Sequence, residues 1–170
     1  MLRPLTFDDA SSVIQILGDD DALRYWAGEL VTTTAAATQF IESVLEACQQ
    51  HRFMQWAVET PAAAMAIGLC KIYDLKASHK VAAIGFTLRR ADWGHGIMSD
   101  ALNALLRFAF EQLHLRRVEA FTHPDNDRAL RLLSRQGFVV EGRLREKYMG
   151  RGGAQDALAL ALLKSDWAAR

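Results

Sequence analysis

A strand–helix–strand run between residues 81 and 122 constrains the fold more than any other part of the chain. Val81–Leu88 is apolar and suits a buried strand, and Arg117–Thr122 is a second segment of that kind. Between them, from about Gly96 to Leu113, apolar side chains recur at the spacing of one helix face. A helix that joins two neighbouring strands of one sheet leaves them parallel. We therefore predict that Arg117–Thr122 lies parallel to Val81–Leu88.

The rest of the chain predicts antiparallel strands and flanking helices. The expected elements are, in chain order, a strand at Leu2–Leu5, a helix capped by Thr6, a helix from Thr32–Thr34 to about Gln50, strands at Gln55–Glu59 and Ala64–Tyr73, a helix at Asn126–Gln136 that Gly137 ends, and strands at Phe138–Leu144 and Ala157–Leu163. This order predicts an α/β sandwich with a mixed sheet and excludes a doubly wound parallel sheet.

Composition limits the classes of protein that remain. With 170 residues, 51% of them hydrophobic, the chain is expected to form one domain over residues 1–170. Twenty basic and twenty acidic residues give no net charge, so we expect no binding to nucleic acid or membranes through bulk charge. Cys48 and Cys70 lack the spacing of a metal site. The N-terminus does not resemble a signal peptide, and a cytoplasmic location is expected.

A glycine-containing loop follows the first strand of the parallel pair. After Leu88 and the four residues Arg89–Asp92 comes Trp93-Gly94-His95-Gly96, and the long helix then begins. Backbone N–H groups at such a helix start can bind phosphate, provided that no side chain holds the anion away. The dinucleotide fingerprint GxGxxG is excluded because Ser99 stands at its third glycine, and no GK[ST] follows for a P-loop.

The helix after the second parallel strand carries another ordered motif. It opens with Asn126-Asp127-Arg128-Ala129-Leu130 and ends at Gly137-Phe138. Taken alone, Asn126 is a helix N-cap and Gly137 a helix stop.

The two motifs together resemble the GCN5-related N-acetyltransferase (GNAT) superfamily, in particular its branch of ribosomal-protein N-terminal (alanine) acetyltransferases. The resemblance runs nearly end to end. Matching segments are LRPLTFDDA at the N-terminus, Ala83–Leu88, Trp93–Leu102, Arg117–Ala120, Pro124–Asn126, Gly137–Gly142 and Leu144–Glu146. Several matches in one order are much more specific than any single motif.

Four positions depart from the pattern of the family. Met98 replaces a small residue, which is expected to narrow the pyrophosphate turn, and Asp100 replaces the usual Glu of the branch. Ala129 stands where the branch often has Ser. Leu133 stands where other branches have a Tyr thought to protonate the leaving thiolate.

The resemblance implies the fold and the cosubstrate. The fold is the acyl-CoA N-acyltransferase sandwich, a mixed, mostly antiparallel sheet with two splayed parallel central strands flanked by helices. The reaction is direct attack of a primary amine on acetyl-CoA in a ternary complex. Residues implied to bind acetyl-CoA are Phe86, Leu88, Trp93, Gly94, His95, Gly96, Ile97, Met98, Ser99, Asn126 and Arg128. The Leu88 amide is the candidate for polarising the thioester carbonyl.

The groups that move protons are less well defined by the sequence. Candidates are Glu119, Glu141, His123 and Tyr148. Tyr148 is preferred as the acid, because it follows the sixth strand and could reach the sulfur. Glu119 lies on the strand beside the gap of the parallel pair, but the preferred interpretation is a structural carboxylate paired with an arginine. No histidine pair has metal-ligand spacing, so no metal is expected.

The acceptor stays open at this level. A protein N-terminus, another peptide, a polyamine and a small amine antibiotic all suit the chemistry, and the regions Asp19–Thr34 and Tyr73–Lys80 are expected to shape the acceptor site. Loss of both hydroxyls keeps a catalytically inactive acetyl-CoA sensor as an alternative. Tyr25 and Trp26 suit either an acceptor pocket or a partner-binding module. The chain is expected to be a monomer or a homodimer.

Overall fold

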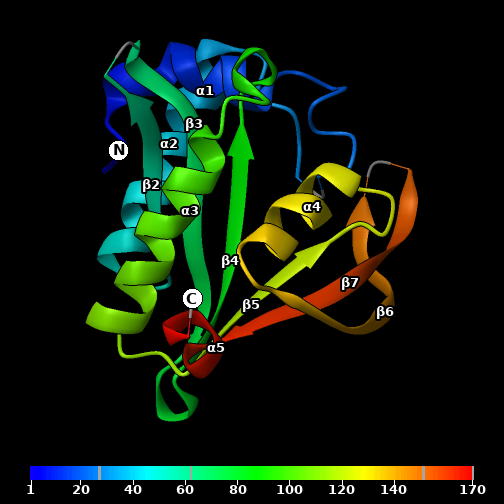
Figure 1. Cartoon of the computed structure of the whole chain (residues 1–170). Helices are drawn as coiled ribbons and strands as arrows, with labels where there is room; N and C mark the ends of the chain where they lie inside the picture. Colours follow the sequence, from blue (N-terminus) through cyan, green and yellow to red (C-terminus); the bar gives the residue numbers. More distant parts are fainter. Residues whose placement is uncertain (27, 62, 151, 170) are drawn as a thin grey trace.

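A computed structural model describes residues 1–26, 28–61, 63–150 and 152–169. Its core is one seven-stranded sheet in the order β1-β2-β3-β4-β5-β7-β6 (Figure 1). The strands are β1 (Leu2–Arg3), β2 (Phe53–Thr60), β3 (Ala63–Lys76), β4 (Val81–Leu88), β5 (Arg117–Thr122), β6 (Val139–Gly150) and β7 (Gly153–Leu163). Among the described strands, only β4 and β5 pair in parallel, so the predicted central pair and the mixed sheet are confirmed.

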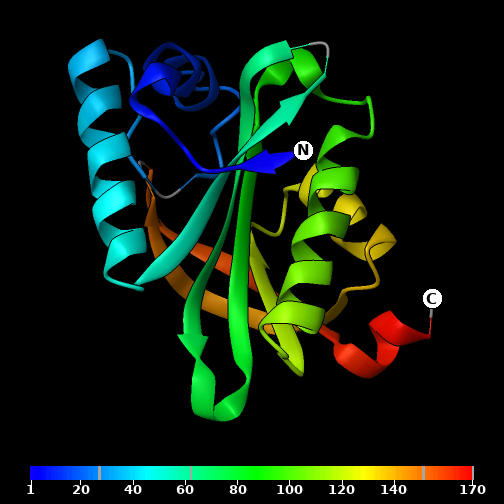
Figure 2. The same cartoon turned by 90° about the vertical axis from the view of Figure 1, so that its left-hand side faces the viewer.

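Helices cover both faces of this sheet (Figure 2). They are α1 (Ala10–Leu17), α2 (Thr34–Gln49), α3 (Ile97–Arg107), α4 (Asp127–Arg135) and the short α5 (Lys164–Ala168). The helices α1 and α2 pack on one face against β2 and β3, while α3 and α4 lie on the other. Two apolar cores result. Ile16, Ile41 and Leu69 belong to the first, and Leu105, Phe110 and Val118 to the second.

Several element boundaries differ from those expected. The first strand ends at Arg3, because Thr6 opens a 3-10 turn whose Asp9 side chain accepts a hydrogen bond from the Thr6 amide. The long helix is α-helical only to Arg107 and continues as one π-helical turn over Phe108–Gln112. The final hairpin is much longer than predicted, because β6 and β7 pair as far as Gly150 and Gly153. Tyr148 therefore lies within β6 and does not follow it.

The N-terminal strand is held to the first helical layer by one arginine. The Arg3 guanidinium donates to both carboxylate oxygens of Asp9, at 2.8 and 2.7 Å, and also to the Glu59 carboxylate on β2. Asp9 is only 3% exposed. The bonds from Arg3 hold the pKa of the Asp9 carboxyl below its ordinary value, against the opposing effect of burial.

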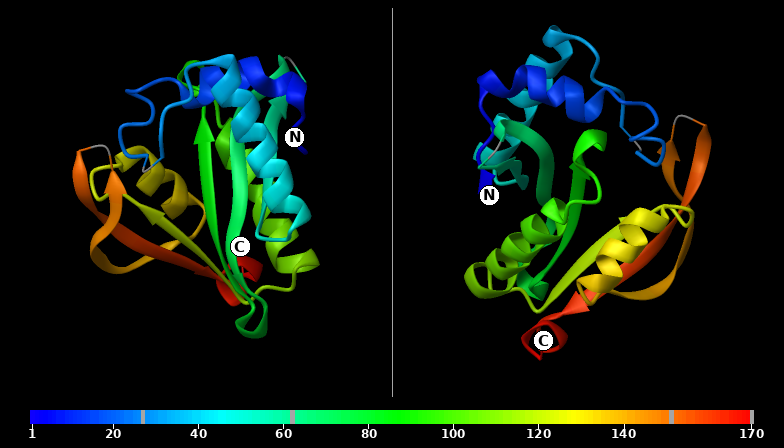
Figure 3. Two further views of the ribbon diagram at one scale, coloured as in Figure 1. Left: turned by 180° about the vertical axis from the view of Figure 1, so that it is seen from behind. Right: turned by 45° about the horizontal axis from the view of Figure 1, so that its top comes forward.

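The parallel pair separates partway along its length. Pairing runs from Val81 opposite Arg117 to Ile84 opposite Ala120, and β4 continues to Leu88 without further partners on β5. Beyond Ile84 the two strands diverge (Figure 1 and Figure 3, right). In the rear view of Figure 3, left, α2 covers the half of the sheet that holds β2 and β3. The predicted splay of the central strands is therefore present.

Candidate acetyl-transfer site

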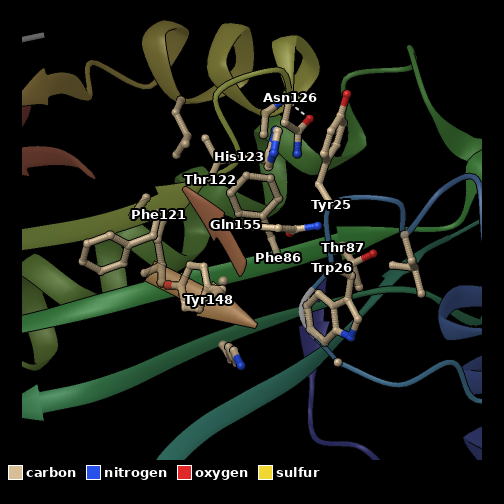
Figure 4. A pocket seen from close by; sticks show the side chains of 18 of the residues that line it. Tyr25, Trp26, Phe86, Thr87, Phe121, Thr122, His123, Asn126, Tyr148 and Gln155 are labelled. Atoms are coloured by element: carbon tan, nitrogen blue, oxygen red, sulfur yellow. Dashed lines mark hydrogen bonds between the residues drawn. The ribbon is translucent and has the colours of Figure 1, made fainter. Parts of the chain in front are cut away.

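A cleft of about 480 Å³ opens where β4 and β5 separate (Figure 4). Its walls come from the loop before α2, from β3, β4 and β5, from the start of α4, and from the β6–β7 hairpin. The lining residues are Ala22, Leu23, Tyr25, Trp26, Gly28, Lys71, Tyr73, Ile84, Gly85, Phe86, Thr87, Ala120, Phe121, Thr122, His123, Asn126, Ala129, Leu133, Tyr148, Gln155 and Asp156. Of the residues predicted to bind acetyl-CoA or to move protons, Phe86, His123, Asn126 and Tyr148 are among them.

The hydrogen-bond register of β4 decides which of its backbone groups face the gap. The Arg89 amide donates to the Ile67 carbonyl at 2.8 Å, so positions 67 and 89 form a hydrogen-bonded pair. Such pairs alternate with non-bonded ones in an antiparallel ladder. Phe86 and Leu88, opposite Cys70 and Gly68, are then non-bonded positions whose N–H and C=O groups point away from β3. They point toward the separating strand β5.

The loop after β4 has an open backbone. Gly94 and Gly96 have φ angles of 85° and 77°, which other L-residues adopt only with strain. A Cβ atom added at either position would meet nothing within 4 Å. The first intrahelical bond of α3 runs from the Asp100 amide to the Gly96 carbonyl, so the preceding amides of the first turn have no carbonyl partner within the helix. These donors suit an anion such as a pyrophosphate.

Three predicted residues meet beside this loop. The Trp93 indole N–H donates to the Leu88 carbonyl at 2.8 Å, and the Arg128 guanidinium carbon lies 4.2 Å from the centre of the Trp93 ring. The start of α4 is thereby brought next to the start of α3. Arg131, one turn further along α4, is exposed and lies 3.9 Å from Asp127 of the same helix.

Met98 does not narrow the turn as expected. Its side chain is 7% exposed and belongs to the core under α3, where the Cys70 thiol donates to its sulfur at 3.6 Å. The expectation that Met98 narrows the pyrophosphate turn was wrong, because its side chain faces the sheet and not the loop. Burial raises the pKa of the Cys70 thiol to about 12, so this cysteine stays protonated.

Asn126 serves as the N-cap that its position predicts. Its Oδ1 accepts a hydrogen bond from the Ala129 amide at 3.2 Å. The side-chain NH₂ group is not used in that bond, and the residue also lines the cleft. Asn126 can therefore cap α4 and present its NH₂ group to the cleft in the same conformation.

The two candidate glutamates belong to an ion-pair network. The Arg117 Nε donates to Glu119 at 2.8 Å, and its two terminal nitrogens bond the two carboxylate oxygens of Glu141 at 2.8 and 2.5 Å. The hydrogen bonds from Arg117 lower the pKa of Glu141. Neither glutamate is among the lining residues of the cleft. The Arg-paired interpretation of Glu119 is confirmed.

Tyr148 reaches the cleft from β6 and meets a second tyrosine. The Tyr73 side chain, on β3, is hydrogen-bonded to the Tyr148 side chain. Burial raises the pKa of Tyr148, and the hydrogen bond with Tyr73 opposes that rise. Tyr148 therefore keeps its proton at neutral pH.

Lys71 is the functional candidate that sequence reasoning missed. It stands opposite Gly85, and a Cβ at that glycine would lie 2.9 Å from Cε of Lys71, so its aliphatic chain crosses β4 at the bare position. Burial lowers the pKa of its amine. In the apolar run Ala64–Tyr73 it reads as an ordinary outward residue of a strand. The only available signal was a glycine opposite it on the neighbouring strand.

The rim of the cleft is partly as predicted. Tyr25 and Trp26 line it, and the Tyr25 ring stacks on His123 with 4.8 Å between ring centres. The loop between Tyr73 and Lys80 does not contribute, apart from Tyr73 itself. Its tip lies at the far end of the parallel pair, where the Arg116 amide and side chain donate to the Lys80 and His79 carbonyls. Gln155 and Asp156, from the β6–β7 hairpin, form that wall instead.

Two kinds of feature are absent from the described residues. No cluster of three or more His, Cys, Asp or Glu side chains there could hold a metal ion. No helix in the described part of the chain is long and apolar enough to cross a membrane.

A splayed parallel pair beside an open glycine loop defines an acyl-CoA-dependent transferase. The acetyltransferase (GNAT) domain family matches residues 1–139. The chain belongs to this family and is an acetyl-CoA-dependent N-acetyltransferase.

Individual relatives agree with that family. The uncharacterized N-acetyltransferase YoaA of Bacillus subtilis is 27% identical over 96% of this chain and 93% of its own length. The putative ribosomal N-acetyltransferase YdaF of the same species is 30% identical over 59% of this chain and 55% of its own length.

Solved structures show the same fold. Mycobacterium smegmatis RimJ, in complex with CoA-disulfide, superposes with a TM-score of 0.88 at 22% identity, covering 96% of this chain and 81% of its own. The spermidine N-acetyltransferase of Vibrio cholerae, in complex with CoA and spermine, gives 0.85 at 22% identity, covering 99% and 97%.

Proposed function

We propose that this acetyltransferase transfers an acetyl group to a primary amine of a peptide, a protein N-terminus or a small molecule by direct attack within a ternary complex. The observation that carries the proposal is the gap between β4 and β5, which opens directly into the cleft on the side of Tyr25 and Trp26. One end of such a gap can take a thioester while the cleft presents the amine. Proximity of the two reactants is then the main source of rate.

In this proposal the cosubstrate lies along β4. Acetyl-CoA supplies the activated acetyl thioester. The amides of residues 94–99 hold the pyrophosphate, with Arg128 beside them on the Trp93 ring. The outward backbone groups of Phe86 and Leu88 and the free NH₂ of Asn126 bond the pantetheine arm. At Leu88 the carbonyl accepts a hydrogen bond from the Trp93 indole, and the amide donates to the thioester carbonyl.

Direct attack also agrees with where the cysteines lie. Cys70 is buried in the core with a raised pKa, and Cys48 belongs to α2. Neither is among the described residues that line the cleft. The described part of the site therefore has no cysteine that could form an acyl-enzyme intermediate. As the amine nitrogen bonds the acetyl carbon and the C–S bond breaks, Tyr148 gives its proton to the departing sulfur, and the proton that the nitrogen loses returns to Tyr148 through water. Glu119 serves to hold Arg117.

An amine screen tests the proposal. The intact protein is incubated with acetyl-CoA and a panel of peptides, polyamines and small amines, and release of free CoA thiol is followed. We expect release that depends on at least one amine. Binding of acetyl-CoA without release for any amine would favour the inactive sensor.

A further inference from the structure

Lys71 lies in the cleft in an environment that does not match an ordinary surface lysine. Its Nζ is 4.8 Å from the centre of the Tyr73 ring and 5.7 Å from that of the Trp26 ring. Among the described residues, no carboxylate pairs with it. Asp156, the one carboxylate among the described lining residues, is bound by Arg143 at 2.7 Å and by the Glu146 amide at 2.8 Å.

Two aromatic faces around an ammonium group form the kind of cage that proteins use to bind cationic ligands. Here the cage formed by Trp26 and Tyr73 is filled from within the protein. The absence of a side chain at Gly85 gives the Lys71 chain its path across β4. A ligand ammonium would have to displace Lys71 from the rings or lie next to its charge, and both are unfavourable.

We propose that Lys71 is a specificity-determining residue that occupies this aromatic cage and selects acceptors with one primary amine beside a carbonyl or carboxylate oxygen, against polyamines. The inference rests on the proposed amine acetylation. An ammonium group has three N–H donors and no acceptor, so it can bond an oxygen next to the acceptor amine. In a peptide such an oxygen lies three bonds from the α-amine nitrogen, whereas spermidine and spermine offer only further cations.

The same charge favours acceptors that lose a proton readily. The attacking amine must be neutral, and α-amines have ordinary pKa values near 8, against about 10.4 for an alkylamine such as that of lysine. A neighbouring cation lowers the pKa of the acceptor further. Burial also holds the pKa of Lys71 itself below its usual value, in agreement with a cation that has no counter-charge.

The test compares three variants of the full chain. Lys71→Met keeps the length and removes the charge, Lys71→Arg keeps the charge, and Lys71→Gln provides a second neutral variant if the methionine variant folds poorly. Lys76→Met is the matched control, because it removes one positive charge at the exposed hairpin tip, where Lys76 lies 3.6 Å from Asp74. The acceptors are spermidine and an alanine-led peptide without basic residues.

Two measurements decide the proposal. For the neutral variants we expect the ratio of kcat/KM for spermidine to that for the peptide to rise about tenfold or more over wild type. Calorimetry with spermine and the CoA-loaded protein should show tighter binding by a similar factor. Lys71→Arg and Lys76→Met should resemble wild type. If both quantities stay within about twofold of wild type in the neutral variants, the role of Lys71 is refuted.

Failure of the proposed function gives a different result. If the wild-type protein releases no thiol with any amine, acetyl transfer to amines is refuted. The spermine affinities of wild type and the four variants still decide the role of Lys71, because they need no turnover.

Discussion

The side chains of Tyr73 and Tyr148 are hydrogen-bonded to each other across the cleft, one from β3 and the other from β6. When Tyr73 donates this bond, the proton of Tyr148 is free for another acceptor. The bond also stabilises the phenolate that forms when that proton leaves. An acid positioned in this way can protonate a departing thiolate.

Tyr148→Phe should lower turnover by roughly 10- to 100-fold, within or below the usual contribution of one acid–base group. The affinity for acetyl-CoA should be almost unchanged, because the hydroxyl acts on the departing sulfur. Steady-state kinetics with a confirmed acceptor and calorimetry with acetyl-CoA measure the two effects. Wild-type turnover in the variant would remove Tyr148 from the mechanism and leave water as the proton carrier.

Tyr73→Phe separates the two tyrosines. The bond from Tyr73 lowers the pKa of Tyr148, so its removal should raise that pKa and move the alkaline limb of the rate profile to higher pH. The loss of turnover should be smaller than in Tyr148→Phe, under about tenfold. An equal or larger loss would identify Tyr73 as the group that touches the substrate.

Local patterns were enough to predict the frame of the site. The parallel pair followed from a helical crossover between two apolar segments, and the open loop followed from two glycines before a helix. Both are short-range features, so the sequence shows them directly. The cap at Asn126 needed only its residue type before a helix, whereas its place beside the gap was implied by the family resemblance.

The acceptor side needed long-range pairing that no local pattern gives. Tyr148 enters the cleft because β6 continues past an irregularity between Leu144 and Tyr148 and pairs with β7 up to the Gly150–Gly153 turn. Lys71 and Tyr73 alternate with core residues of β3, and such alternation predicts solvent exposure on an edge as readily as a cleft. Which one holds depends on the segment that carries Trp26, far away in the sequence.

Gly96→Val should weaken acetyl-CoA binding by about 10- to 100-fold, equivalent to one or two lost charge-assisted hydrogen bonds. Open space surrounds the position, so no clash is expected inside the protein, but the side chain would stand where the anion approaches. The φ angle of 77° adds strain for a β-branched residue. Gly142→Val is the control, because its Cβ also meets nothing within 4 Å and no positive φ is present. Calorimetry on both folded variants gives the comparison, and equal affinities would place the pyrophosphate elsewhere.

Arg128→Ala should reduce acetyl-CoA affinity several-fold, and the reduction should shrink as salt is added, because a partly exposed ion pair is screened. Arg131→Ala is the matched control for Arg128→Ala. It removes the same charge from the same helix, but Arg131 is not beside Trp93 and the loop. The two variants are compared by calorimetry at low and high salt. Equal losses would mean that α4 acts through its general positive charge and that Arg128 makes no specific contact.

Asp9→Asn should destabilise the fold by about 2–3 kcal/mol, since it breaks charge-assisted bonds from Arg3 to a carboxylate that is only 3% exposed. The pKa of Asp9 is lowered in the folded state, so its stabilising contribution is complete above the ordinary carboxyl pKa of 3.8. That contribution is lost as the pH falls below 3.8 and through the lower folded-state pKa. Urea unfolding between pH 7 and pH 3 measures both effects. Wild type should lose stability toward pH 3 more steeply than Asp9→Asn, and parallel curves would show that the Arg3–Asp9 pair contributes nothing to acid sensitivity.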